Sequence, residues 1–266
     1  MKYENRIVAF IDILGFKAIV GATLDEDGNE VSEKIKTLND TLLLVRHEFD
    51  MDEPDTKLTK SRQVTQFSDS VVISFLAQEP SEVFYILLDL LHLVINFVGV
   101  GVLCRGGIAF GKLIHTDKVL FGPALIKAYE TETRAALFPR IILSDYIIAL
   151  GAKYHLSHHD PADELDSILD IVTVDTDGMY YIDYFTNAQS ELNDPAYDMP
   201  EYITRLRKII KEMSQHDEPD IVVKFGWMKD KFNKLIDVSR GEAFIKRLKK
   251  SGNYELAEFY SKQVHM

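Results

Sequence analysis

The chain has very little cysteine and tryptophan and no dense run of basic residues. Its 266 residues include a single cysteine, Cys104, which excludes an internal disulfide. The formal net charge is −12, and non-specific affinity for nucleic acid comes from neutralising phosphates with lysine and arginine, so nucleic acid binding is not expected. The lone cysteine and the lack of a signal-peptide pattern at the start of the sequence predict a cytoplasmic location.

The sequence also has no uninterrupted apolar run long enough to cross a membrane. Its longest apolar stretch, from Val83 to Cys104, contains Asp89, His92 and Asn96. Polar groups in the middle of a membrane-spanning helix are costly. We therefore expect no membrane span, and instead a buried helix that runs into a strand.

Two aspartates stand next to short strand-like runs. Ile7 to Ile11 is an apolar run with β-branched members, and Asp12 follows it, with Gly15 as the turn that comes next. Asp69 lies between two further strand-like runs, as at the tip of a hairpin. We expect Asp12 and Asp69 to meet and to hold a divalent metal. The alternative is that Asp12 caps the following helix and Asp69 closes a turn.

The order of the expected elements predicts an α+β fold with a ferredoxin-like sheet. Strands are expected at 7–11, 62–67, 71–76, 100–114, 119–121 and 140–143, and helices at 16–23, 32–45, 83–97, 123–132 and 144–150. We place a first domain at residues 1–150. Residues 151–266 are expected to form an extension with one short strand and several helices, which packs on the first domain or on a second copy of it.

Five segments in this order resemble class III nucleotide cyclases. They are Phe10-Ile-Asp-Ile-Leu-Gly-Phe16, Ser68-Asp69, Arg105-Gly-Gly-Ile-Ala-Phe-Gly111, Phe121-Gly122 and Arg140-Ile-Ile-Leu-Ser144. The resemblance implies a mostly antiparallel sheet flanked by helices, and a homodimer with the active site at its interface, because only one such domain is visible here.

The resemblance also implies a set of site residues. Asp12 and Asp69 would hold two Mg²⁺ or Mn²⁺ ions, with the carbonyl of Ile13 as a further ligand. Gly15, Phe16 and Thr65 would contact the nucleotide, although threonine is also an ordinary strand residue. Arg105 would bind the triphosphate or a pyrimidine carbonyl; the alternative is a surface arginine paired with a carboxylate.

The departures from the purine-specific cyclases indicate a particular branch. Thr65 stands where those enzymes carry a base-reading lysine or glutamate, Val119 replaces a second base-reading aspartate, and Ile126 and Glu130 replace an asparagine and an arginine. This pattern is similar to the bacterial pyrimidine cyclases of the Pycsar antiphage systems. The resemblance implies conversion of UTP or CTP to cyclic UMP or cyclic CMP, as a defence signal.

Two other interpretations stay open. One is a purine nucleotide cyclase, adenylate or guanylate, with unusual base recognition. The other is a catalytically silent module that binds nucleotide and regulates. In the helix after Gly122, we expect Glu130 and Glu132 on a solvated face and Tyr129 in the core.

Overall fold

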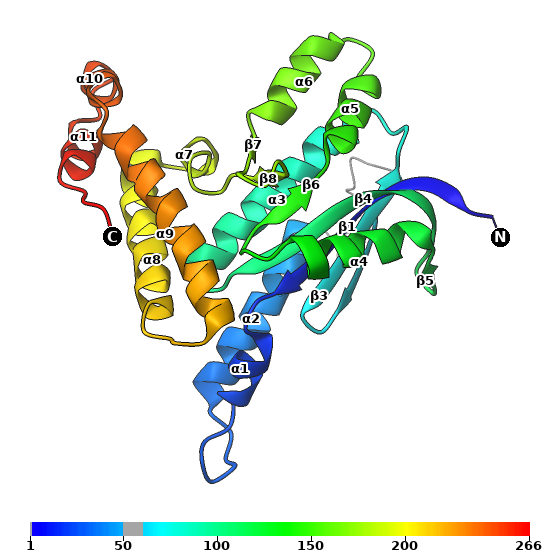
Figure 1. Ribbon diagram of the computed structural model, residues 1–266, viewed down its shortest axis with the longest axis horizontal. Helices are drawn as coiled ribbons and strands as arrows, with labels where there is room; N and C mark the ends of the chain where they lie inside the picture. Colours follow the sequence, from blue (N-terminus) through cyan, green and yellow to red (C-terminus); the bar gives the residue numbers. More distant parts are fainter. Residues whose placement is uncertain (1, 50–60) are drawn as a thin grey trace. The chain divides into compact units, whose positions relative to one another are not determined.

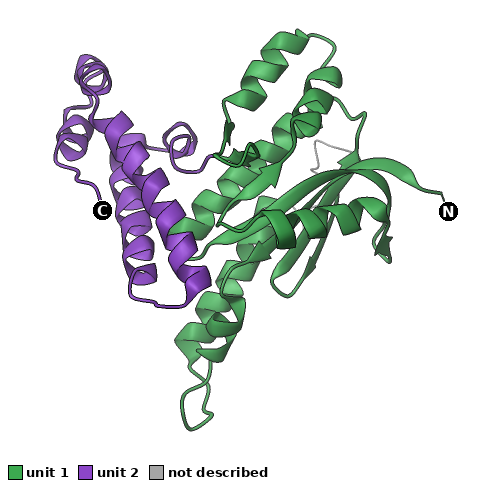
Figure 2. Ribbon diagram, in the orientation of Figure 1, with its two compact units in different colours: residues 1–182 green, residues 183–266 purple. Residues whose placement is uncertain are grey.

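The computed structural model describes residues 2–49 and 61–266. The charged stretch 50–60, which contains a proline and for which the sequence predicts a loop, lies outside them. The chain divides into two compact units, Met1–Ile182 and Asp183–Met266 (Figure 2).

The first unit confirms the expected element order. Its elements are β1 (Glu4–Ile13), α1 (Phe16–Gly21), α2 (Ser32–Glu48), β2 (Gln63–Phe67), β3 (Ser70–Leu76), α3 (Glu82–Gly99), β4 (Cys104–His115), β5 (Leu120–Phe121), α4 (Pro123–Ala135), β6 (Ile141–Leu143), α5 (Asp145–Lys153), α6 (Pro161–Leu169), β7 (Val172–Val174) and β8 (Tyr180–Ile182). Figure 1 shows them along the chain and labels all of them except β2.

One sheet joins these strands in the order β2-β3-β1-β4-β6-β8-β7, with β5 paired to β4. All neighbours are antiparallel except β4 and β6, which are parallel. The predicted α+β class with a mostly antiparallel central sheet is therefore confirmed. The long strand β1 lies in the middle, between β3 and β4.

Helix α4 crosses one face of this sheet (Figure 1). Small residues make the close packing possible, since Ala124 and Ala128 of the helix are buried against Val8 and Ala109 of the strands. Gly107 of β4 brings the helix closest, because a Cβ there would lie 2.7 Å from the Ala128 carbonyl oxygen. The other face is also buried, at residues such as Ile7, Ile11 and Ile73. A strand buried on both faces reads as the continuous apolar run seen at Ile7 to Ile11.

Helix α3 is the apolar stretch noted in the sequence. By length and composition alone it could cross a membrane, with a mean hydropathy of 1.7. Leu87, Leu90 and Leu93 are fully buried within the unit, and 61% of the helix is buried, as in the core helix of a globular domain.

The first compact unit extends further than the boundary that we placed at residue 150. The strand β8 pairs with β6, so that Tyr181 lies opposite Ile142, and β7 pairs with β8. Fully buried Arg140 forms ion pairs with Asp175 and Asp177 of the β7–β8 turn. Residues 151–182 therefore complete the sheet, and the compact unit ends at Ile182.

The second unit is helical, as expected for most of the extension. It contains α7 (Ala188–Glu191), α8 (Pro195–Met213), α9 (Pro219–Arg240), α10 (Glu242–Lys250) and α11 (Tyr254–Ser261). Its core includes Trp227 of α9, whose ring lies edge-on to Phe185 at a centroid distance of 5.9 Å. Tyr202 of α8 is buried and donates a hydrogen bond to the carbonyl of Tyr184.

Candidate metal and nucleotide site

The first unit brings Asp12 and Asp69 to the same end of the sheet. Asp12 lies at the end of β1 and pairs in register with Ser70, the residue that follows Asp69. The amide of Ile13 donates a hydrogen bond of 3.1 Å to the Asp69 carbonyl oxygen, which ties the hairpin tip to the end of β1. The two carboxylates thus come from segments 57 residues apart, and neighbouring strands hold them together.

The electrostatics of Asp12 show that these carboxylates interact. Burial raises the pKa of Asp12, and the nearby charge of Asp69 raises it further. Arg105 and a 3.4 Å hydrogen bond from the Ser70 hydroxyl lower the pKa without cancelling the rise. Two like charges held this close are unfavourable without a cation beside them.

Local backbone geometry produces both carboxylate positions. Gly15 has φ +73° and turns the chain from β1 into α1, as its position in the sequence predicted. At the hairpin tip, Ser68 has φ +56°, a conformation that costs a non-glycine residue about 1 kcal/mol. The tip therefore has a strained backbone beside Asp69, and strain of this kind is concentrated at functional sites.

Arg105 joins this cluster from the neighbouring strand. It is the register partner of Asp12 in β4, and its guanidinium forms an ion pair with Glu132 of α4. The expectation of a solvated Glu132 is wrong, because its side chain is only 2% exposed. Burial raises the pKa of Glu132, Arg105 lowers it, and Asp12 raises it. Arg105 is thus paired with a carboxylate, but at a half-buried position on the face that carries Asp12 and not at the surface.

Thr65 of β2 lies on the same face of the sheet, two strands from Asp12. The register runs from Thr65 to Val72 and from Val72 to Phe10, two residues before Asp12. Paired residues share a face, and so do residues two apart in a strand. The Thr65 hydroxyl is hydrogen-bonded to Nε2 of His115 at 2.9 Å.

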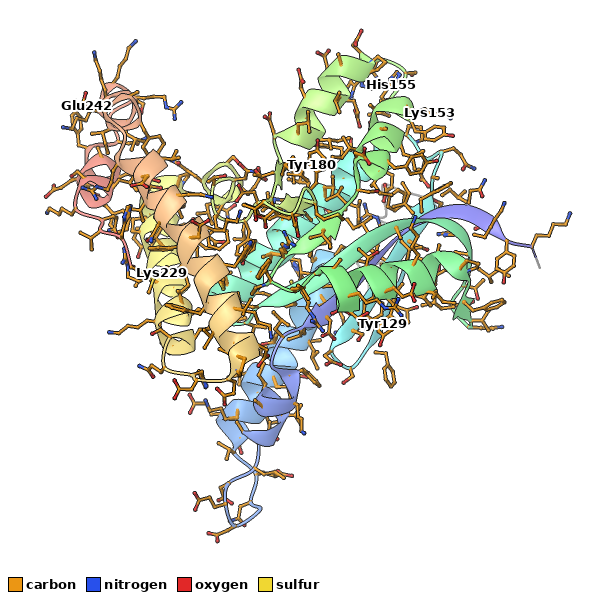
Figure 3. All side chains as sticks on the ribbon, viewed as in Figure 1. Tyr129, Lys153, His155, Tyr180, Lys229 and Glu242 are labelled. Atoms are coloured by element: carbon orange, nitrogen blue, oxygen red, sulfur yellow. The ribbon has the colours of Figure 1, made fainter. Side chains whose placement is uncertain are left out.

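One further residue of α4, Tyr129, is more exposed than the sequence predicted. Tyr129 was expected in the core, but it is 50% exposed and meets Phe10 edge-on at 5.4 Å. It lies on α4 in Figure 3. Glu130 is exposed as expected and pairs with Arg134 at 3.1 Å. Ile126, at 60%, is exposed on the same helix.

The chemistry of the donor set fits a hard divalent ion. Two carboxylates supply oxygen ligands, which Mg²⁺ and Mn²⁺ prefer, and their mutual repulsion favours a cation between them. The described part of the chain contains no group of three or more acidic, histidine or cysteine side chains close enough to hold a metal. A metal at this position would therefore take its remaining ligands from backbone, water and substrate, as Mg²⁺ does when it binds through one or two carboxylates and phosphates.

Sequence reasoning missed Glu132 and His115. The signal for Glu132 was present, because Ala124, Ala128 and Glu132 recur every four residues and so share one helix face. That face is the buried one. His115 gave a weaker signal, since its partners Thr65 and Ser74 lie 50 and 41 residues away in the sequence.

No model of a known protein family matches the chain, and no curated sequence does. Among solved structures, the chain is similar to the adenylyl cyclase CyaB from P. aeruginosa, with 14% identity and a TM-score of 0.44, over 68% of this chain and 94% of that one. It is also similar to two structures of bacterial light-regulated adenylyl cyclases, with 13% and 15% identity and TM-scores of 0.40. The matches cover 63% and 56% of this chain, and 57% and 45% of those chains. At these values the likeness says nothing about activity.

Proposed function

We propose that the chain is a nucleotide cyclase that converts a pyrimidine ribonucleoside triphosphate, UTP or CTP, to the 3′,5′-cyclic monophosphate and pyrophosphate. The observation that supports this is the convergence of Asp12 and Asp69, tied by the Ile13 amide, beside Arg105. In the reaction, the ribose 3′-oxygen forms a bond to the α-phosphorus while the bond to the bridging oxygen of pyrophosphate breaks. The 3′-hydroxyl proton passes to water, and pyrophosphate leaves.

Asp12 and Asp69 would hold Mg²⁺ or Mn²⁺, with the Ile13 carbonyl as a further ligand. When bound, two such ions increase the acidity of the 3′-hydroxyl and neutralise the triphosphate. The carboxylates set the position of that charge because β1 and the hairpin fix their backbones.

Arg105 would bind the triphosphate or the base carbonyl. Its ion pair with Glu132 orients the guanidinium, because a buried carboxylate on α4 anchors one side of it. Gly15 and Phe16 would contact the nucleotide from the turn after β1, and Thr65 would contact the base from β2.

The exposed apolar side chains near the site support a homodimer whose partner completes the active site. Phe67 at the hairpin tip is 80% exposed, and Ile126 and Tyr129 of α4 are 60% and 50% exposed. Light scattering coupled to size exclusion should give twice the monomer mass. A strict monomer under the assay conditions would contradict this part of the proposal.

The test of the activity is incubation of the purified protein with Mn²⁺ and each of the four ribonucleoside triphosphates separately, with products identified by mass spectrometry. We expect cyclic UMP or cyclic CMP together with pyrophosphate. A cyclic purine monophosphate would instead support the purine alternative. No product from a folded dimer would support the silent module or an enzyme that awaits its trigger. The role in antiphage defence stays a prediction from the resemblance.

A further inference from the structure

A chain of buried polar groups leads from the start of β1 to Thr65. Arg6 Nε donates to Ser74 Oγ at 2.9 Å, Ser74 Oγ is 2.8 Å from His115 Nδ1, and His115 Nε2 is 2.9 Å from Thr65 Oγ1. Ser74 is fully buried, and Arg6 and His115 are 3% and 5% exposed. The chain ends at Thr65, which is partly exposed on the face that carries Asp12.

The partners fix the direction of each hydrogen bond. Arg6 can only donate, so the Ser74 oxygen accepts from it. The buried Ser74 hydroxyl then needs an acceptor for its proton, because a buried donor without a hydrogen bond is costly. Among the described residues, the partners of this hydroxyl are Arg6 and His115 Nδ1. We therefore assign Nδ1 as the acceptor.

This assignment determines the state of the Thr65 hydroxyl. Burial, and then the charge of Arg6, lower the pKa of His115 to about 4, so the ring is neutral at pH 7 and carries one proton. With Nδ1 accepting, that proton is on Nε2 and is donated to Thr65 Oγ1. The Thr65 oxygen accepts this bond, which leaves its own proton to be donated. Among the described residues no other partner of Thr65 Oγ1 is recorded.

The position of Thr65 suits contact with the base of a nucleotide whose phosphate lies at Asp12. Thr65 lies two strands away from β1, level with Phe10, and therefore two residues along the strand from Asp12. With strands about 4.8 Å apart and about 3.4 Å per residue, the two Cα atoms are roughly 12 Å apart along one face. This separation is comparable to the span of a nucleotide from a phosphate, across the ribose, to the far edge of the base.

We propose that Arg6, Ser74 and His115 hold the Thr65 hydroxyl as a hydrogen-bond donor toward the exocyclic group at position 4 of the base, so that the site selects uracil, which has a carbonyl there, over cytosine, which has an amine. His115 is then a positioning residue, because it acts through Thr65. A cytosine amine cannot accept the Thr65 proton, so the hydroxyl would have to turn its proton away from the base and use its second lone pair, which gives up the geometry that His115 holds and weakens binding. The inference rests on the proposed function and names its substrate.

The test measures binding selectivity separately from turnover. The 3′-deoxy forms of UTP and CTP lack the attacking hydroxyl, and their affinities in the presence of Mn²⁺ can be measured by titration calorimetry. We expect the wild-type protein to bind the uridine analogue at least about tenfold more tightly than the cytidine analogue. Thr65→Val, which keeps the shape without the hydroxyl, should reduce the ratio to below about threefold. His115→Phe should reduce it in the same way, and Thr65→Ser should retain the wild-type ratio.

A second measurement is independent of nucleotide. The ring ¹⁵N shifts of His115, assigned by comparison with His115→Gln, should show a neutral ring protonated at Nε2. A proton at Nδ1 would overturn the inference. Equal or tighter binding of the cytidine analogue by the wild-type protein would also overturn the inference. That result would leave the proposed cyclase function intact. Failure of the wild-type protein to bind either analogue would overturn the proposed function and this inference with it.

Discussion

Asp12 and Arg105 are register partners in the paired strands β1 and β4, so an acid and a base face the same side of the sheet at its end. Asp12 has a second acid beside it, Asp69, and Arg105 has another, Glu132. The cluster therefore has three carboxylates and one guanidinium. Its carboxylates outnumber its cationic groups, and bound divalent cations would offset the excess negative charge.

Removing one of the two paired carboxylates should stabilise the metal-free protein. Asp69→Asn relieves the repulsion with Asp12, by on the order of 1 kcal/mol, which is a Tm increase of about 2–4 °C. If the chain binds metal and cyclises nucleotide as we propose, Mn²⁺ should raise the Tm of the wild-type protein, and this variant should lose both that increase and the cyclase activity. Thermal denaturation with and without Mn²⁺ measures both effects. Asp117→Asn, in an exposed loop, is the control and should behave as wild type.

The ion pair of Arg105 and Glu132 should contribute more to the free energy of unfolding than an exposed ion pair on the same helix. Glu132→Gln leaves the half-buried Arg105 poorly compensated, and we expect a loss of about 2–3 kcal/mol in the free energy of unfolding. Glu130→Gln removes an exposed partner of Arg134 and should cost less than about 0.5 kcal/mol. Urea unfolding of both variants checks this difference. Equal costs would show that burial of Glu132 has no energetic consequence.

The close approach of α4 to the sheet should make Gly107 intolerant of a side chain. A Cβ at this position would lie 2.7 Å from the Ala128 carbonyl oxygen and 2.8 Å from the Glu132 amide nitrogen. Gly107→Ala should therefore push α4 away and lower stability by about 2–3 kcal/mol. The matched control is Gly111→Ala, whose Cβ would contact the Ala124 Cβ at 3.4 Å and should be tolerated. If both variants unfold at the wild-type urea concentration, the packing described for α4 is wrong.

His115 should make stability depend on pH. Its pKa is about 4 in the folded protein, below the usual 6.5, so the unfolded chain binds more protons between these values. The contribution of His115 to the free energy of unfolding is therefore fully present above about pH 6.5. It falls by about 3 kcal/mol in total as the pH decreases to below 4.

Glu82 opposes this trend, because burial raises its pKa to about 7 and the folded state then binds more protons between pH 4.5 and 7. The measurement is therefore the difference between wild type and His115→Gln in urea unfolding at pH 4.5, 5.5 and 7. This difference should grow with pH. A constant difference would mean that His115 is not held neutral by its surroundings.

Several features of the fold could be predicted because they depend on local pattern. The run Ile7 to Ile11 followed by Asp12 and Gly15 gave a strand, a carboxylate and a turn, all confirmed. The boundary between the units could not be predicted, because it depends on β8 pairing with β6, a contact between strands that are each three residues long. Short strands have too few residues to show an alternating pattern.

Some features of the candidate site could likewise be predicted from the sequence, and others could not. The spatial meeting of Asp12 and Asp69 followed from strand ends and a hairpin, which the sequence marks. The ion pair of Arg105 with Glu132 depends on how α4 lies across β4, and the hydrogen bond of His115 to Thr65 depends on the register of distant strands. Such contacts are set by tertiary packing. The spacing of Ala124, Ala128 and Glu132 places Glu132 on the buried face of α4, but it does not identify Arg105 as the partner.

The most direct test of the metal site is a crystal of the protein grown with Mn²⁺ and 3′-deoxy-UTP, measured at a wavelength where manganese scatters anomalously. We predict anomalous peaks within coordination distance of the Asp12 and Asp69 carboxylates and of the triphosphate oxygens. Manganese bound elsewhere, or nucleotide bound away from these two aspartates, would contradict it.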